Sequence, residues 1–198
     1  MILSDRDIKA KIATGEIVVT SPGNDHISNI HASSMDFRLG YYFKIYEHTR
    51  HAVLDPTKST SFENITRLIK LENKNTPFIV QPGEFLLGVS LETVKLPDDI
   101  VARVEGRSSL GRLGIIVHST AGFIDAGFEG TITLEITNIN RMPVALYPEM
   151  RVCQLAFEMM SCAAEVPYYK KPHAKYQGQI LPEESRISTD PEFSKLSS

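Results

Sequence analysis

One carboxylate stands out in a run of alternating residues near the middle of the chain. Residues 131–137 read Thr-Ile-Thr-Leu-Glu-Ile-Thr, so alternation places Ile132, Leu134 and Ile136 on one face of a strand and Glu135 on the other. On an exposed face Glu135 is an ordinary solvated side chain, whereas on a pocket wall it can act as a general base. Periodicity alone favours the exposed strand.

A second group of residues has the composition of a phosphate site. Residues 105–112 read Glu-Gly-Arg-Ser-Ser-Leu-Gly-Arg, which places Ser108 and Ser109 between Arg107 and Arg112. Backbone amides, hydroxyls and guanidinium groups are the donors that an anionic phosphate needs. A Walker loop is absent from the sequence. A capped turn with solvated arginines explains the pattern equally well, so both interpretations stay open.

The glycine-rich stretch 118–128 also allows a ligand to approach. Its small residues let the backbone come close to a bound molecule, and Asp125 could accept a hydroxyl proton there. A tight turn in which Asp125 bonds its own backbone is a common alternative. His118 by itself favours a structural role. Cys153 and Cys162 fit no zinc motif, so we expect packing cysteines and no zinc.

Short strands must position these groups. A helix is predicted over residues 4–14, with Ser4 as its cap, Gly15 at its end and Ile8 and Ile12 on one face. Strands are predicted at 16–20, 37–46, 78–80, 84–90, 100–105, 131–137, 143–146 and 152–157. Many short strands separated by turn signals indicate an all-β sandwich or barrel. Residues 47–75 are predicted to be an irregular polar excursion.

Composition narrows the class of protein further. The 198 residues suit one domain, and a net charge of -3 argues against a strongly basic nucleic-acid binder. No apolar run approaches 18 residues, so we expect no membrane span. The N-terminus becomes charged too early for a signal peptide, and two cysteines cannot build a disulfide framework. A cytoplasmic location is therefore expected.

Several motifs together resemble the dCTP deaminase family, within the wider trimeric dUTPase superfamily. They are Gly-Arg-Ser-Ser-Leu-Gly-Arg at 106–112, His-Ser-Thr-Ala-Gly-Phe-Ile-Asp-Ala-Gly-Phe at 118–128 and Ile-Thr-Leu-Glu at 132–135. Further matches are the opening helix, Ser-Met-Asp-Phe-Arg-Leu-Gly at 34–40, Gln154-Leu155 and Lys-Tyr-Gln-Gly-Gln at 175–179. The resemblance spans about residues 1–180 in the expected order.

The resemblance implies a fold and an activity. It implies a distorted jelly-roll or β-barrel subunit with a short N-terminal helix, working as a homotrimer whose nucleotide sites lie between subunits. Residues 1–180 would form this single domain, including a segment that covers the nucleotide, and 181–198 would be a mobile tail. The implied reaction is deamination of dCTP to dUTP and ammonia without zinc, with Mg²⁺ bound through the triphosphate.

The resemblance also implies roles at the reacting base. Glu135 would be the general base and then the acid, and Arg112 would support the anionic centre. Ser108 and the backbone of Ala121 would hold the water and the edge of the cytosine. No membrane or nucleic-acid partner is implied, and dTTP is a common feedback inhibitor in the family.

Other residues would bind the rest of the nucleotide. The implied triphosphate contacts are Arg107, Ser108, Ser109, Gln154, Lys175 and Gln179, with Tyr168 at the phosphates or the lid. Asp125 would take the 3'-hydroxyl and Ile124 would crowd the 2' position. Cys153 departs from the family, which has glycine there, and would narrow the approach of a phosphate.

The product is a separate question. Residues 120–128 resemble the members that go on to hydrolyse dUTP to dUMP and pyrophosphate, and Gly122 would leave room beside the base. Alternatives are a deaminase that releases dUTP, a dUTPase without deaminase activity, a nucleotide-sensing regulator and a structural jelly-roll protein.

Overall fold

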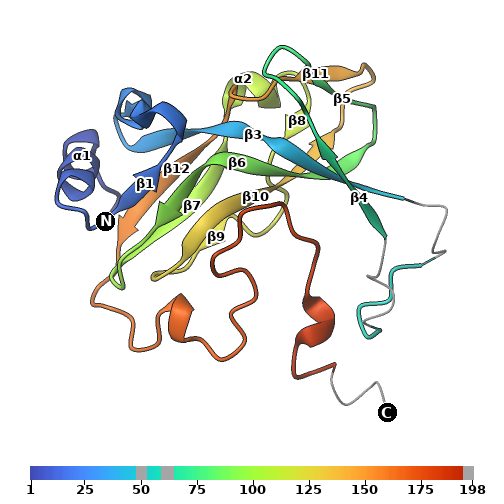
Figure 1. The fold of residues 1–198 in the computed structure, drawn as a ribbon. Coiled ribbons are helices and arrows are strands. Elements are labelled where there is room, and N and C mark those ends of the chain that lie inside the picture. Colours follow the sequence, from blue (N-terminus) through green and yellow to red (C-terminus); the bar gives the residue numbers. More distant parts are fainter. Residues whose placement is uncertain (48–52, 59–64, 194–198) are drawn as a thin grey trace.

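A computed structural model describes residues 1–47, 53–58 and 65–193. A strongly curled antiparallel sheet dominates it, with the strand order β8-β10-β6-β3-β12-β7-β9 and with β1, β2 and β4 attached at its sides (Figure 1). A small second sheet pairs β11 with β5. The predicted mainly-β fold with a short N-terminal helix is confirmed.

The strands are β1 (Val18–Thr20), β2 (Ile30–His31), β3 (Ser34–Tyr46), β4 (Thr66–Lys70), β5 (Phe78–Val80), β6 (Phe85–Lys95), β7 (Ile100–Gly106), β8 (Ile115–Ile116), β9 (Phe123–Ile124), β10 (Glu129–Asn138), β11 (Val144–Leu146) and β12 (Arg151–Met159). The helices are α1 (Asp5–Ala13), the one-turn α2 (Ser108–Gly111) and the 3-10 turns η1 (Pro22–Asn24), η2 (His26–Asn29), η4 (Tyr168–Lys170) and η5 (Ile187–Thr189). Every predicted strand is present, and most are longer than predicted.

Helix α1 forms as its sequence predicts. The Ser4 hydroxyl accepts a hydrogen bond from the backbone N–H of Asp7 at 3.3 Å, and Gly15 ends the helix in the left-handed region, with φ at 76°. Ile8 is fully buried and Ile12 packs partly against the core. None of the helices that the structure describes is both long and apolar enough to cross a membrane.

Strand β3 explains why the sheet curls. Its first half pairs with β12, its second half pairs with β4, and β6 runs along its other side. A break in the β3–β6 register lets one 13-residue strand belong to both halves of the sheet. The prediction that 47–75 is irregular is wrong for β4, because the free edge of β3 supplies hydrogen-bond partners for this polar segment.

Alternation along β3 separates a buried face from a polar face. Met35, Phe37 and Leu39 are fully buried in the core, so Asp36 and Arg38 point to the opposite side of the sheet. Both of these charged groups find partners there.

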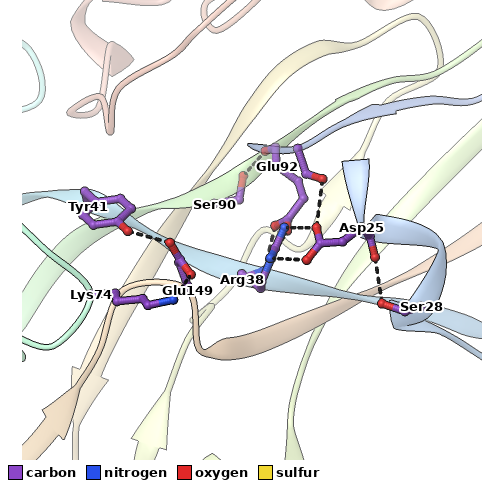
Figure 2. A network of polar contacts seen from close by, with 9 residues as sticks. Asp25, Ser28, Arg38, Tyr41, Lys74, Ser90, Glu92 and Glu149 are labelled. Atoms are coloured by element: carbon purple, nitrogen blue, oxygen red, sulfur yellow. Dashed lines mark hydrogen bonds and ion pairs between the residues drawn. The ribbon is translucent and has the colours of Figure 1, made fainter. Parts of the chain in front are cut away.

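Arg38 connects β3 to β6 and to the turn that precedes β2 (Figure 2). Its backbone N–H and its Nε donate to Glu92 at 2.7 and 2.6 Å, and its two terminal nitrogens donate to Asp25 at 3.0 and 2.9 Å. Glu92 is fully buried. Burial by itself would lower the pKa of Arg38, but the hydrogen bonds and charges of Glu92 and Asp25 more than offset it and raise that pKa.

The segment after β12 runs back along β10 (Figure 1, orange to red). The Gly178 N–H donates to the Glu129 carbonyl at 2.7 Å, and the Thr131 N–H donates to the Gln179 carbonyl at 3.0 Å. Gly130 has φ at 150°, and a Cβ there would lie only 3.0 Å from the Gln179 carbonyl oxygen. Glycine therefore permits this close approach. The predicted mobility of residues 181–198 stays a prediction.

Candidate functional site

A pocket of about 500 Å³ is lined by residues of β7, β9 and β10, the loop before β9 and the C-terminal segment. Six of the residues singled out from the sequence line it: Ala121, Ile124, Asp125, Glu135, Tyr168 and Gln179. These residues come from positions 121 to 179, and the fold brings strand, loop and C-terminal segment residues together around one space. Most of the remaining lining is apolar or aromatic, which is typical of a site for a planar ring.

Glu135 lies on the wall of this pocket. The opposite face of β10 carries Leu134 and Ile136, both 0% exposed, as the alternation predicts. Ile132, 6% exposed, lies where the register with β6 shifts between Thr131 and Thr133, and it lines the same pocket as Glu135. The Glu135 carboxylate accepts a hydrogen bond from the Ser119 backbone N–H at 3.1 Å. Of the two interpretations of this strand, the exposed one is therefore wrong, and the carboxylate faces a space that can hold a ligand.

The loop before β9 packs tightly on β7. The Val104 N–H donates to the Gly122 carbonyl at 2.7 Å, and a Cβ on Gly122 would lie 2.8 Å from the Val104 carbonyl oxygen. A side chain at this position would push the loop, and with it the Ser119 N–H, away from its place. Gly122 thus serves this close contact with β7, and its expected role of leaving room beside a base stays a prediction.

His118 adds a polar group to the same pocket. Neither ring nitrogen has a hydrogen-bond partner in the structure, and both are buried. An unpaired polar group at a pocket wall is available to a ligand or to water. The sequence favoured a structural role for His118, and the part of the chain that the structure describes supplies no partner for it.

Asp125 and Ile124 lie side by side at the pocket rim. Ile124 is buried on β9, opposite Ala102. The Asp125 side chain is 46% exposed and forms a loose ion pair with Lys171 at 3.8 Å. Its backbone carbonyl accepts from the Phe128 N–H, which closes the predicted turn. The carboxylate remains accessible from the pocket.

Two aromatic residues complete the pocket and were not singled out from the sequence. Tyr46 ends β3 and Tyr176 belongs to the C-terminal segment. Burial, and then the charges of Glu184 and Glu135, raise the pKa of Tyr46, so its hydroxyl stays a donor. Tyr176 could have been identified from the sequence, because it follows Lys175 in the C-terminal motif. No sequence pattern pointed to Tyr46.

The predicted site residues around α2 form a second group elsewhere. Arg107 precedes α2, Ser108 and Ser109 are exposed in its single turn, and Arg112 follows it. None of these four lines the pocket within the described chain, and neither does Gln154. Val104 contributes to the pocket wall, whereas Gln154 and Glu105, paired across β12 and β7, face the other side of that sheet.

Cys153 does not crowd this group. It is 1% exposed and belongs to the core, on the face of β12 opposite Gln154. Burial raises the pKa of its thiol well above the usual range. Having cysteine instead of glycine at position 153 therefore adds a side chain to the core. That side chain does not obstruct the face of β12 that carries Gln154.

A buried carboxylate organises the second group and was missed by sequence reasoning. Asp36 is 3% exposed, and one of its oxygens lies 3.1 Å from His31 Nε2, 3.3 Å from Arg151 and 3.5 Å from Arg107. Asp36 also pairs with Gln154 across β3 and β12. The sequence did contain a signal for Asp36. It alternates, as Arg38 does, with apolar residues of a buried strand.

The C-terminal motif residues have protein partners in the described structure. The Gln179 amide donates to the Thr131 carbonyl at 2.6 Å, and Lys175 forms an ion pair with Asp190 at 2.6 Å. The Tyr168 hydroxyl accepts from the Tyr176 N–H at 3.2 Å. No group of three or more His, Cys, Asp or Glu residues in the described ranges is arranged to hold a metal ion.

Comparisons with known proteins identify the family of this chain. A model of the dCTP deaminase-like family matches residues 2–160. The chain is 54% identical, over 96% of both chains, to a protein of Dictyoglomus thermophilum named dCTP deaminase, dUMP-forming. It is 44% identical to a Thermomicrobium roseum protein named dCTP deaminase, over 99% of this chain and 98% of that one.

A solved structure supports the fold. The 2'-deoxycytidine 5'-triphosphate deaminase of Agrobacterium tumefaciens superposes with a TM-score of 0.61 at 23% identity, over 80% of this chain. The match spans 47% of that longer chain, so it concerns the architecture alone. Because the family model matches residues 2–160 and a relative is 54% identical over 96% of the chain, the chain belongs to the dCTP deaminase-like family.

Proposed function

We propose that this protein deaminates dCTP and then hydrolyses the resulting dUTP in the same site to dUMP and pyrophosphate. The names of its relatives support this activity. The observation that carries the proposal is Glu135, whose carboxylate lies on the wall of an apolar pocket and is oriented by the Ser119 N–H at 3.1 Å. A single oriented carboxylate is what a proton shuttle at a cytosine ring requires.

The chemistry follows from this placement. Glu135 takes a proton from water, and the resulting hydroxide attacks C4 of cytosine. The protonated Glu135 passes this proton to ring N3, then takes the proton of the new C4 hydroxyl and passes it to the amine, so that ammonia departs and the C4 carbonyl of uracil forms. The backbone of Ala121 lines the same pocket and can hold the base edge. A carboxylate that alternates between base and acid needs no bound zinc for these steps.

We further propose that the site is shared between copies of the chain in a homotrimer. Ser108 and Arg112, which would hold the water and support the anionic centre, do not line the pocket of their own chain. A neighbouring copy can present them to that pocket, since cyclic oligomers bring different surfaces of identical chains together. Light scattering of the purified protein tests this: a trimer is expected, and a monomer that turns over dCTP would contradict a shared site.

The remaining nucleotide contacts would also be divided between two copies of the chain. One copy would bind the triphosphate through Arg107, Ser108, Ser109 and Gln154. The segment over the pocket would add contacts from Tyr168, Lys175 and Gln179. The amides and charges of Gln179 and Lys175 are engaged by Thr131 and Asp190, so binding requires these contacts to exchange. Asp125 would accept the 3'-hydroxyl, and buried Ile124 would exclude a 2'-hydroxyl.

Magnesium would be held mainly by the nucleotide. A triphosphate carries about four negative charges, and Mg²⁺ commonly bridges its oxygens and keeps several waters. The chain's own part would be to neutralise the remaining charge. Because dTTP carries the same sugar and triphosphate, we propose that it competes for the site. We also keep the cytoplasm as the proposed location, in line with two free cysteines.

Product analysis is the test. The purified protein is incubated with dCTP and Mg²⁺, the nucleotides are separated, and ammonia is assayed in parallel. Equal amounts of dUMP, pyrophosphate and ammonia with little free dUTP are expected. Accumulation of dUTP would instead indicate a deaminase that stops at the first step, as the name of the Thermomicrobium relative allows. Absence of ammonia would contradict deamination.

A further inference from the structure

The outer face of β3, β12 and the end of β7 carries a cluster that the proposed function does not yet use. It consists of Arg107, Arg151 and His31 around the Asp36 carboxylate. All three partners approach the same carboxylate oxygen, at 3.1 Å for His31, 3.3 Å for Arg151 and 3.5 Å for Arg107. Arg107 also donates to the Arg151 carbonyl at 3.2 Å, so the two arginines are tied to each other as well.

The charges in this cluster do not balance. Two guanidinium groups face one carboxylate, which leaves one positive charge even when His31 is neutral. The carboxylate is 4% exposed, whereas the side chains of Arg107 and Arg151 are 30% and 43% exposed. Each arginine therefore keeps donors directed to solvent, because a guanidinium has five N–H groups and one weak ion pair occupies few of them.

The cluster adjoins the proposed triphosphate residues. Gln154 pairs directly with Asp36 across the two strands, and its carbonyl oxygen accepts from the Ser34 hydroxyl at 2.6 Å. That hydrogen bond orients the Gln154 amide, so that its NH₂ group lies on the other side of the side chain. Donors from Arg107, Arg151 and Gln154 thus belong to one polar face of the sheet.

We propose that Arg151 is an additional binding residue for the triphosphate and that Asp36 positions Arg151 and Arg107 together for this purpose. This inference rests on the proposed function, because the ligand is the nucleotide's own triphosphate. Two guanidinium groups held side by side match an anion with several charged oxygens. Asp36 fixes their separation and orientation before the ligand arrives, which reduces the entropy lost on binding.

The first test compares ligands with and without the terminal phosphates. Binding of dCTP, dCMP and inorganic triphosphate, each with Mg²⁺, is measured for the wild type and for Arg151→Gln. We expect Arg151→Gln to weaken dCTP and inorganic triphosphate about tenfold, and dCMP by less than about twofold, as loss of one charge-assisted contact predicts. Unchanged dCTP affinity, or equal loss for dCTP and dCMP, would overturn the role of Arg151.

Arg67→Gln is the matched control. Arg67 also pairs with one carboxylate, Glu47 at 3.1 Å, and is 58% exposed. Its register partner Ile45 lies nine residues beyond Asp36 on β3, a distance of roughly 30 Å along an extended strand. Removing this guanidinium changes the net charge equally, so it should leave all three affinities unchanged. A tenfold loss of dCTP affinity here would attribute the effect to overall charge and overturn the proposal.

Asp36→Asn tests the positioning role by the sign of its effect. If Asp36 organises the arginines, its loss weakens dCTP binding and raises KM with little change in kcat. If Asp36 only neutralises them, removing a negative charge tightens binding, which would overturn the positioning role. Arg151→Lys keeps the fold and the charge but loses the planar donor arrangement, and should recover only part of the affinity lost in Arg151→Gln. Full recovery would contradict paired recognition.

The failure of the proposed function is distinguishable from the failure of this inference. A wild type that binds inorganic triphosphate through Arg151 but neither binds nor turns over dCTP would contradict the proposed function alone. A wild type that turns over dCTP with no effect of Arg151→Gln would contradict the inference alone.

Discussion

The pocket and the Asp36 cluster are built in opposite ways. The pocket has mostly apolar and aromatic walls with one oriented carboxylate, Glu135, and a histidine without partners in the described structure. The cluster has one buried carboxylate surrounded by cationic groups whose outer ends reach solvent. The first environment suits a neutral ring that must exchange protons, and the second suits an anion.

This difference is the basis for our proposal that the site is shared between copies of the chain. The ring needs apolar surroundings, whereas the triphosphate needs polar, charged ones. The fold separates the pocket from the Asp36 cluster by placing them on different sides of the β12–β7 sheet. A nucleotide needs both at once. Pairing the pocket of one copy with the cluster of another provides both without bringing the Asp36 cluster beside the Glu135 carboxylate of the same chain.

The largest expected effect comes from the pocket. Glu135→Gln keeps the shape of the side chain and removes its basicity, so deamination should fall by about 10³-fold or more while dCTP affinity changes little. Steady-state ammonia release and equilibrium binding measure the two quantities. Glu129→Gln is the control, since Glu129 begins the same strand and its carboxylate pairs only with exposed Lys95 among the described residues. Retained turnover in Glu135→Gln would remove the base role.

Mixing variants tests the division between copies directly. Glu135→Gln and Arg112→Gln should each be inactive alone, because each removes one half of the site. After joint unfolding and refolding, random assembly should restore roughly a quarter of the sites, each with an intact pocket and an intact neighbour. Ammonia release from the mixture measures this recovery. No recovery from mixed oligomers, verified by mass spectrometry, would show that both halves come from one chain.

Arg38→Met probes the strand that carries Asp36. It leaves Glu92 buried without its cationic partner, and loss of one partner from such a pair costs about 3–5 kcal/mol in the free energy of unfolding. Denaturant unfolding followed by circular dichroism measures this loss. Lys9→Met, which breaks an exposed ion pair with Asp5 on α1, is the control and should cost little. Equal stability of the two variants would contradict a structural role for the Arg38 network.

A smaller effect is expected where the C-terminal segment attaches. Glu184 binds Lys44 at 2.5 Å and also accepts from the Thr66 hydroxyl. Burial raises the pKa of Glu184, but the hydrogen bonds from Lys44 and Thr66 more than offset this and hold that pKa below its ordinary value of 4.5. The attachment is therefore complete above pH 4.5 and is lost as the pH falls through the lower, bound-state pKa.

Glu184→Gln should accordingly raise the KM for dCTP by about threefold, because the segment over the pocket is held less firmly. Steady-state kinetics at neutral pH measure the change, and hydrogen exchange of residues 175–186 reports the loosening. Glu165→Gln, an exposed carboxylate on the preceding stretch, serves as the control. An unchanged KM together with unchanged exchange would show that Glu184 does not hold the segment.

The reactivity of the two cysteines reports which of them is buried in the core and which is at the surface. Cys162 is exposed and should react quickly with a thiol reagent, whereas burial and a raised pKa should keep Cys153 unreactive until the protein unfolds. One reactive thiol per native chain is expected, and two after denaturation. A second thiol that reacts in the native state would place Cys153 on the same side as Gln154.

Local pattern was sufficient for much of the fold. The spacing of Ile132, Leu134 and Ile136 predicted the buried face of β10, and Ser4 and Gly15 predicted the ends of α1. These features depend on neighbours within a few residues, so the sequence contains them directly. The irregular segment 47–75 was predicted less well, because β4 exists only through the free edge of β3.

The sequence by itself determined which residue types are available: one carboxylate in an apolar strand, hydroxyls between arginines, and a glycine-rich loop. Only the tertiary structure decided that Glu135 faces a pocket, that the arginines lie outside it, and that Asp36 holds Arg107 beside Arg151. These groups lie tens of residues apart and meet through strand pairing. Periodicity states which side of a strand a residue occupies, and the packing of distant segments decides what that side encounters.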